Sequence, residues 1–173
     1  ERSHNHYDRF RGRLMFPIVQ PGGSVIAFSG RILPQFEKDE EGQKAPKYIN
    51  SQESILYQKS KTLFGLNLAS RYLRERGQVI LVEGNVDVLT MHQRGHQECV
   101  APLGTALSEH QSQILARFTK KAILCFDGDR AGSKATWKAA ALLLDQDIDS
   151  RVVALREGED PDSVDAERLK NIL

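Results

Sequence analysis

Residues 121–129, Lys-Ala-Ile-Leu-Cys-Phe-Asp-Gly-Asp, decide the fold that this sequence predicts. The stretch is a short apolar run that ends on two carboxylates separated by Gly128. Such a run is typical of a strand buried on both faces of a parallel sheet. A carboxylate at the end of a buried strand is costly unless it meets a cation or hydrogen-bond donors. Asp127 and Asp129 lie two apart in an extended segment and can point the same way, while Gly128 would let a phosphate or metal approach closely.

The same pattern of an apolar run followed by carboxylates occurs at two further places, residues 78–87 and 150–162. Loops at the carboxyl ends of parallel strands share one edge of the sheet, so residues far apart in sequence can converge there. Magnesium is usually held by one or two carboxylates together with a substrate phosphate. We therefore predict a magnesium site and a phosphorylated substrate. The carboxylates of this predicted acidic rim are Glu83, Asp87, Asp127, Asp129, Asp160 and Asp162.

From Gln78 onward the sequence alternates strand and helix patterns four times. This alternation predicts an α/β domain with a mostly parallel sheet flanked by helices, and the apolar run at 152–155 is interpreted as another strand buried on both faces. Ser108 is a predicted N-cap, and Trp137 is expected to pack its helix against the sheet. An Asp that opens a helix is often a cap, so a capping role for Asp129 competes with a metal-binding role.

Before Gln78 the patterns predict a smaller, basic α+β subdomain. Residues 13–19 and 25–31 are expected to form an antiparallel hairpin, with Pro17 indicating an edge strand or a bulge. Residues 63–76 are expected to form a helix capped by Gly77. We predict two domains, residues 1–76 and 77–173. The apolar face of the predicted helix comprises Leu66, Leu68, Ala69 and Leu73.

Composition is that of an ordinary globular protein: 173 residues, 40% hydrophobic, 27% charged, with a formal net charge of +1. The basic residues concentrate in the first half and the acidic clusters in the second. No apolar run is long enough to span a bilayer, so we expect a cytoplasmic protein without a membrane partner. Cys99 and Cys125 are expected to be buried thiols rather than zinc ligands. The polar start without methionine suggests a fragment of a longer protein.

The residues that carry these predictions resemble a known domain. Four stretches resemble, in order and spacing, the motifs of the TOPRIM domain, which occurs in topoisomerases, small nucleases, recombination-associated proteins and primases. These stretches are residues 81–88 (LVEGNVDV), 100–107 (VAPLGTAL), 123–132 (ILCFDGDRAG) and 157–163 (EGEDPDS).

Three upstream stretches narrow this resemblance to bacterial DnaG-type primases, the RNA polymerases that make primers on single-stranded DNA. They are residues 8–18 (DRFRGRLMFPI), 26–31 (IAFSGR) and 46–51 (PKYINS). The resemblance implies that Glu83, Asp127 and Asp129 bind the catalytic metal ions, with Asp87, Asp160 and Asp162 completing the rim. It also implies contacts to nucleotide phosphates or template by Arg9, Arg11, Arg31, Lys47, Asn50 and Lys59.

The implied reaction is the joining of a ribonucleotide 3′-hydroxyl to the α-phosphate of an incoming triphosphate, with release of pyrophosphate. The family's chemistry implies Mg²⁺, replaceable by Mn²⁺, with two ions stabilising the attacking and leaving oxygens. Glu83 is then a ligand or a general base; we favour the ligand role, because nearby divalent cations should lower its pKa. The implied partners are single-stranded DNA, ribonucleoside triphosphates, the RNA–DNA product at the bacterial replication fork, and a replicative helicase bound through a domain absent here. No zinc is expected in this part of the protein.

Two other classes of function remain open at this point. A TOPRIM nuclease would use the same carboxylates with water as the nucleophile, and a topoisomerase would add a nucleophilic tyrosine, which no sequence context marks here. A catalytically inert fragment would bind nucleotides or single strands without turnover. Nucleotide incorporation separates these classes from a primase.

Overall fold

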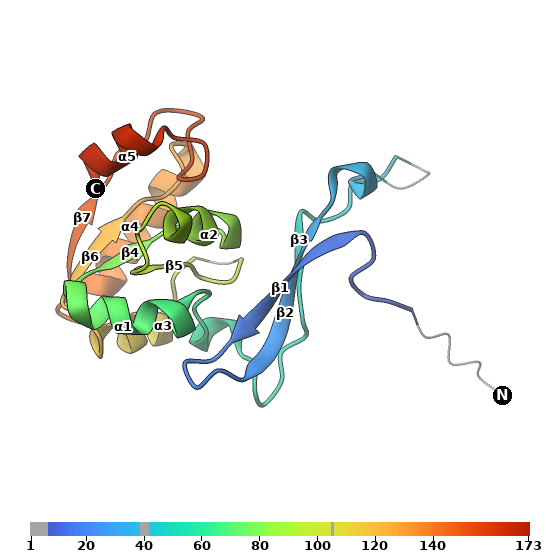
Figure 1. The fold of residues 1–173 in the computed structure, drawn as a ribbon, viewed down its shortest axis with the longest axis horizontal. Coiled ribbons are helices and arrows are strands. Elements are labelled where there is room, and N and C mark those ends of the chain that lie inside the picture. The colour runs from blue at the N-terminus through green and yellow to red at the C-terminus, as the bar shows by residue number, and fades with distance from the viewer. Residues whose placement is uncertain (1–6, 39–41, 105) are drawn as a thin grey trace.

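The computed structural model describes residues 7–38, 42–104 and 106–173, which form two sheets and their flanking helices (Figure 1). A three-stranded antiparallel sheet has the order β1-β2-β3, and a four-stranded parallel sheet has the order β5-β4-β6-β7. The predicted combination of a parallel sheet with a preceding antiparallel hairpin is confirmed.

The antiparallel sheet is built on the predicted hairpin. Strands β1 (Arg13–Val19) and β2 (Val25–Ile32) pair from Arg13 opposite Ile32 onward, with an irregularity between Ile18 and Val19. β1 is an edge strand, as Pro17 predicts, because proline cannot donate to a neighbouring strand. The short strand β3 (Tyr48–Asn50), absent from the sequence prediction, pairs with the end of β2. Two short 3₁₀ helices, η1 (Pro34–Phe36) and η2 (Lys59–Lys61), lie in the connections.

The parallel sheet follows the predicted alternation of strands and helices. The core clusters show that α2 and α5 pack on one face, and that α1, α3 and α4 pack on the other. Every pairing between its strands is parallel. The elements in chain order are α1 (Leu66–Arg76), β4 (Val79–Leu81), α2 (Asn85–Gln93), β5 (Cys99–Val100), α3 (Glu109–Ala116), β6 (Lys121–Leu124), α4 (Arg130–Leu144), β7 (Asp149–Val152) and α5 (Ala166–Ile172).

The core runs across the predicted domain boundary. Phe16 of β1 meets Phe64 edge-on, with ring centroids 6.2 Å apart, and both belong to the cluster that fills one face of the parallel sheet. The two sheets are therefore joined through shared apolar packing, and the division at residue 76 stays a prediction. No helix among the described residues is long and apolar enough to cross a membrane.

Several local predictions are wrong, each for a physical reason. The helix expected from residue 63 begins at Leu66, because Phe64 instead bridges to Ala101 and Gly65 adopts a φ of +82°. Leu68 is 58% exposed and Trp137 is 77% exposed, so neither packs against the sheet. The strand expected at residues 152–155 is displaced: β7 covers Asp149–Val152 and is an exposed edge strand, and the buried Val153 follows it. Cys99 and Cys125 are buried free thiols, as predicted, and Ser108 and Gly77 cap their helices.

Candidate functional site

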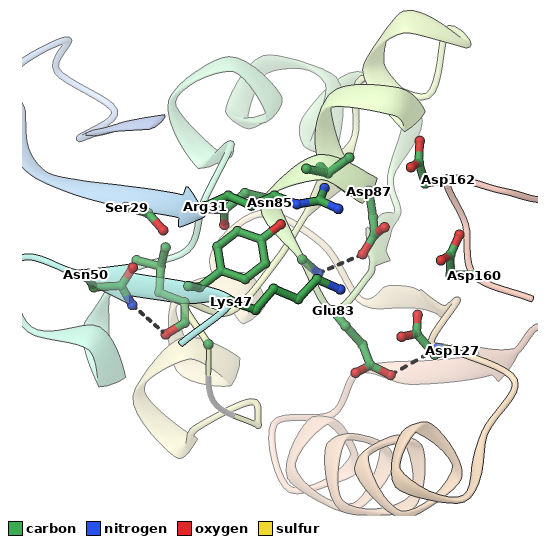
Figure 2. A pocket seen from close by; sticks show the side chains of 15 residues that line it. Ser29, Arg31, Lys47, Asn50, Glu83, Asn85, Asp87, Asp127, Asp160 and Asp162 are labelled. Carbon is green, nitrogen blue, oxygen red and sulfur yellow. Dashed lines mark hydrogen bonds between the residues drawn. The ribbon is translucent and has the colours of Figure 1, made fainter. Parts of the chain in front are cut away.

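A cavity of about 230 Å³ lies between the end of the antiparallel sheet and the carboxyl edge of the parallel sheet (Figure 2). One wall carries acidic side chains and the opposite wall carries basic ones. Its lining comprises Ser29, Arg31, Lys47, Tyr48, Asn50, Glu83, Gly84, Asn85, Val86, Asp87, Leu103, Gly104, Asp127, Asp160 and Asp162.

The structure brings together five of the six carboxylates of the predicted acidic rim. Glu83 follows β4, Asp87 lies in the first turn of α2, and Asp127 follows β6. Asp160 and Asp162 lie in the loop after β7 and face Asp87 and Asp127 in Figure 2. The parallel arrangement of β4, β6 and β7 explains this convergence, because their carboxyl ends meet at one edge.

Hydrogen bonds hold the carboxylates closest to the sheet. Asp127 donates its backbone N–H to Glu83 Oε1 over 3.0 Å, and Gly84 donates its backbone N–H to Asp87 Oδ2 over 2.8 Å. Asp127 Oδ1 is buried, and no described residue donates a hydrogen bond to it. A buried carboxylate oxygen without a donor is costly, and a bound cation would remove that cost.

The local environment raises the pKa of three of these carboxyl groups. Burial, with added repulsion from Asp127, Asp160 and Asp162, raises the pKa of Asp87 to about 7. Burial is also the main cause that raises the pKa of Glu83 and of Asp127, and neighbouring carboxylates add to it. Groups whose charged forms are disfavoured in this way are suited to a site that receives positive charge.

The carboxylates do not form a complete metal-binding site by themselves. Among the described residues, no three His, Cys, Asp or Glu side chains form a group that could by itself hold a metal ion. This arrangement fits Mg²⁺ better than a tightly chelated metal, because Mg²⁺ keeps several waters and takes substrate phosphates as ligands. The orphaned Asp127 oxygen and the oxygen-only donor set therefore suit a hydrated divalent cation.

Asp129 lies outside the cavity lining. Its Oδ1 accepts a hydrogen bond of 2.7 Å from the backbone N–H of Gly132 and caps α4. We expected a phosphate or metal to approach Gly128 closely, but in the structure the backbone of Arg156 does so. A Cβ on residue 128 would lie 1.9 Å from the carbonyl oxygen of Arg156. Glycine at this position lets the loop after β6 pack against the loop after β7.

The basic wall comes from β2, which carries Arg31, and from Lys47, which immediately precedes β3. Arg31 and Lys47 line the cavity opposite the carboxylates, and the Arg31 guanidinium lies 5.9 Å from the centre of the Tyr48 ring. Asn50 donates from Nδ2 to the carbonyl of Leu103 over 3.4 Å, which links this wall to the parallel-sheet domain.

The remaining predicted contact residues lie outside this cavity. Arg9 and Lys59 line a neighbouring cavity of about 540 Å³, which shares Asn50 with the first. Arg11 lines neither cavity, and its guanidinium lies 5.9 Å from the centre of the Tyr7 ring. The six predicted nucleotide or template residues are therefore divided between two cavities that share Asn50, with Arg11 outside both.

Sequence reasoning missed Ser29, which is 1% exposed and lines the cavity. A signal was present, because Ser29 and Arg31 are two apart in β2 and side chains two apart share a face. It also missed Leu103 and Gly104 as cavity residues, although both lie in the stretch 100–107 that resembles a TOPRIM motif. These two residues follow β5 and close the cavity beside Asn50.

Two families match this chain, one for each half. Residues 1–70 match the N-terminal domain of the DNA primase catalytic core, and residues 80–165 match the Toprim-like family. The DNA primase of Listeria monocytogenes is 42% identical over 156 residues, covering 90% of this chain and 24% of that protein. The DNA primase of Aquifex aeolicus is 44% identical over 155 residues, covering 90% of this chain and 30% of that protein. This chain thus spans about a quarter to a third of these relatives.

Solved structures agree with these sequence relationships. The Aquifex aeolicus primase, comprising zinc-binding and RNA polymerase domains, superposes with a TM-score of 0.89 at 40% identity, over 99% of this chain and 42% of that one. A DnaG primase catalytic domain bound to single-stranded DNA gives a TM-score of 0.76 at 41% identity, over 91% and 49%. The chain belongs to the family of bacterial DnaG-type DNA primases and corresponds to a part of their catalytic core that contains the Toprim domain.

Proposed function

We propose that this chain is the part of a DNA primase in which ribonucleotides are joined into RNA primers on single-stranded DNA. The observation that carries the proposal is the cavity with carboxylates on one wall and Arg31 and Lys47 on the other. A triphosphate with its metal ion carries both signs of charge, and this cavity offers the complement of each. The match of residues 1–70 to a primase domain favours a primase over a topoisomerase or a nuclease.

The acidic wall is the proposed metal site. Glu83, Asp127 and Asp87 would hold Mg²⁺, or Mn²⁺ in its place, with Asp160 and Asp162 completing the site. When bound, one or two such ions would supply charge stabilisation to the attacking and leaving oxygens. Asp129 uses only Oδ1 for its helix cap, so its other carboxylate oxygen could still contribute. Glu83 is proposed as a ligand, because its Oε1 already ties it to the loop that carries Asp127.

The basic wall would orient the triphosphate. Arg31 offers a planar fork of donors for phosphate oxygens, and Lys47 offers a point charge. The positive charge of Lys47 partly offsets the rise in the pKa of Asp127, so the two walls already interact electrostatically. By holding the triphosphate against the acidic wall, these two residues would align its α-phosphate for attack by the primer hydroxyl.

The template would follow the neighbouring cavity. Arg9 and Lys59 line it, Arg11 lies exposed nearby in sequence, and Asn50 borders both cavities. Contacts from such cations go to phosphates and position a strand without reading its sequence. We place the whole protein in the bacterial cytoplasm at the replication fork, with an RNA–DNA hybrid as product and a helicase recruited through a region outside this chain.

Incorporation of labelled ribonucleotides on single-stranded DNA, with Mg²⁺ or Mn²⁺, tests this function. This chain is compared with the full-length primase that carries it, and each is accompanied by its Asp127→Ala variant. We expect incorporation that vanishes in the variants, in the full-length protein at least. Nucleotide binding without incorporation in both proteins would favour an inert binding module, and cleavage of labelled DNA without nucleotides would favour a nuclease.

A further inference from the structure

The loop after β7 brings two carboxylates to the cavity without being part of a helix or strand. Within the loop, Ser163 donates its backbone N–H to Asp160 Oδ1 over 2.6 Å, and Val164 donates its backbone N–H to the carbonyl of Asp160 over 3.1 Å. These bonds shape the turn but do not fix its distance from the rest of the acidic wall. A ligand-bearing loop needs that distance fixed, because metal and catalytic sites tolerate displacements of only about 0.5 Å.

Arg94, which follows α2, supplies three bonds to this loop. Its Nη1 donates to the carbonyls of Pro161 and Val164, over 3.0 and 2.9 Å, and its Nη2 donates to the carbonyl of Asp162 over 3.1 Å. All three acceptors are main-chain carbonyls, so the guanidinium holds the path of the chain itself. A planar fork can bridge several carbonyls at once, which the single ammonium of lysine cannot do in the same geometry.

Thr90 lies one turn before Arg94 on α2 and contacts the same loop. Its Oγ1 donates to Asp162 Oδ1 over 2.6 Å. This bond orients the Asp162 carboxylate, leaving its other oxygen for a further ligand. Asp87 lies in the first turn of the same helix. One helix thus carries one carboxylate of the acidic wall and contacts the loop that carries two others.

We propose that Arg94 and Thr90 are positioning residues that hold residues 160–164 against α2, so that Asp160 and Asp162 meet Asp87 and Asp127 at one metal site. The inference rests on the proposed function, because it concerns the assembly of the same acidic wall. Asp127 and Asp160 help to raise the pKa of Asp87, and Asp160 helps to raise that of Asp127, so these carboxylates repel one another when ionised. The loop is also tied to the loop after β6, where Gly128 donates its backbone N–H to the carbonyl of Glu159 over 2.9 Å. Residues 160–164 lie beyond that bond, and without the bonds to α2 the repulsion would move them outward.

The test combines hydrogen exchange of the whole chain, read in a peptide covering residues 156–165, with binding of Mn²⁺ alone, read from the free-ion signal in electron paramagnetic resonance. Arg94→Met keeps the apolar stem and removes the three donors. We expect exchange in this peptide to become faster by on the order of tenfold. The dissociation constant for Mn²⁺ should rise by about 10- to 100-fold, as is typical when support for ligands is lost.

Matched variants separate a positioning role from a general loss of folded structure. Thr90→Val removes the donor at nearly constant shape and should weaken Mn²⁺ binding, whereas Thr90→Ser keeps the hydroxyl and should bind like the wild type. Arg71→Met removes an exposed arginine of α1, whose ion pair is with Glu75, and should change neither readout. If Arg94→Met fails to fold by circular dichroism, the comparison of Thr90→Val with Thr90→Ser decides the question.

Unchanged exchange in residues 156–165 of Arg94→Met would overturn the proposal. Faster exchange with unchanged Mn²⁺ affinity would also overturn it, because Arg94 would then support only the fold. A wild-type chain that binds no Mn²⁺ would do the same. Failure of the proposed function looks different: the predicted effects on exchange and Mn²⁺ would be present, yet the full-length primase would incorporate no ribonucleotide.

Discussion

When no cation is bound, the arrangement of the carboxylates around Asp127 lowers the stability of the folded chain. Burial raises the pKa of Glu83, Asp87 and Asp127, and repulsion from neighbouring carboxylates adds to it. Asp127 Oδ1 is buried and accepts no hydrogen bond from the described residues. Carboxyl groups in such an environment lower the stability of the folded chain, and strongly perturbed pKa values are typical of active sites.

Asp127→Ala should therefore separate stability from metal binding. Without metal, the thermal midpoint should stay the same or rise, because the substitution removes a buried, repelled charge. Added Mg²⁺ should raise the midpoint of the wild type and leave that of the variant unchanged. Thermal unfolding followed by circular dichroism, with and without Mg²⁺, measures both effects. Asp145→Asn, at an exposed carboxylate after α4, is the control. A metal-free loss of more than about 2 kcal/mol would instead assign Asp127 a structural role.

Asp87 predicts a pH dependence of stability. Its folded pKa of about 7 lies above its ordinary value of 3.8. Between these values the folded state binds more protons than the unfolded state, so the free energy of unfolding falls as pH rises toward and through 7. Asp87→Asn should remove this contribution. Urea unfolding without metal, at several pH values, measures this effect. The free energy of unfolding of the variant should rise relative to that of the wild type from pH 4 to pH 8, and a difference that stays constant with pH would contradict the assignment.

The site residues differ in how far sequence alone could place them. The carboxylates of the acidic wall follow apolar runs, and the sheet-edge argument predicts that they meet. The position of Asp127 and Asp129 after the same strand does not distinguish them, because the difference is that Asp129 accepts a hydrogen bond from the first turn of α4 and caps it. Arg94 and Thr90 carry no local signal at all, because their partners lie about seventy residues further along the chain.

At the scale of elements, periodicity predicted the hairpin and most of the strand–helix units. It failed where tertiary contacts override local pattern. β3 has only three residues, and it is a strand because it pairs with the edge of β2. Trp137 and Leu68 look like core residues by type, but their positions on α4 and α1 face away from the sheet. The apolar residues near β7 suggested burial on both faces, yet this strand lies at the edge of the sheet.

The start of α4 provides a test at this scale. Gly132 lies in the first turn of α4, where alanine would ordinarily be favoured over glycine by about 1 kcal/mol. Here a Cβ would lie 2.2 Å from the carbonyl oxygen of Asp127 and 2.8 Å from Glu83 Oε1. Gly132→Ala should therefore lower the free energy of unfolding, by roughly 1–3 kcal/mol, through overpacking against the site.

Gly22→Ala is the matched control, because nothing lies within 4 Å of the Cβ that it would add. Urea unfolding of both variants should show destabilisation only for Gly132→Ala, together with weaker Mg²⁺ stabilisation as the loop after β6 shifts. Equal stability of the two variants would mean that the approach of α4 to this loop is less tight than the structure indicates.

At the scale of the whole molecule, the cavity exists because two sheets share one core. Phe16 and Ile18 of the hairpin belong to the same cluster as Ile80 and Ile123 of the parallel sheet. This packing places the basic wall opposite the acidic one. Sequence predicted the charge of each half, but the facing geometry depends on long-range packing that no local pattern encodes.

The spread of cations predicts a salt-dependent affinity for single-stranded DNA. If about five of the predicted cations neutralise phosphates, the logarithm of the affinity should fall with the logarithm of salt concentration with a slope of about −3 to −4. Lys59→Ala should reduce this slope by about 0.7. Lys170→Ala, at an exposed position in α5, should not change it. Fluorescence anisotropy of a labelled oligonucleotide measures the slope, and equal slopes for both variants would contradict a template path along Lys59.

We propose that one cavity binds a metal-loaded triphosphate between an acidic and a basic wall. The most direct test is calorimetric titration of the chain with a ribonucleoside triphosphate, with and without Mg²⁺, in the wild type, Asp127→Ala and Lys47→Ala. We predict binding that strengthens with Mg²⁺, loses this dependence in Asp127→Ala, and weakens in Lys47→Ala whether or not Mg²⁺ is present. Binding that is the same in all three proteins and indifferent to Mg²⁺ would place the nucleotide elsewhere and contradict the account.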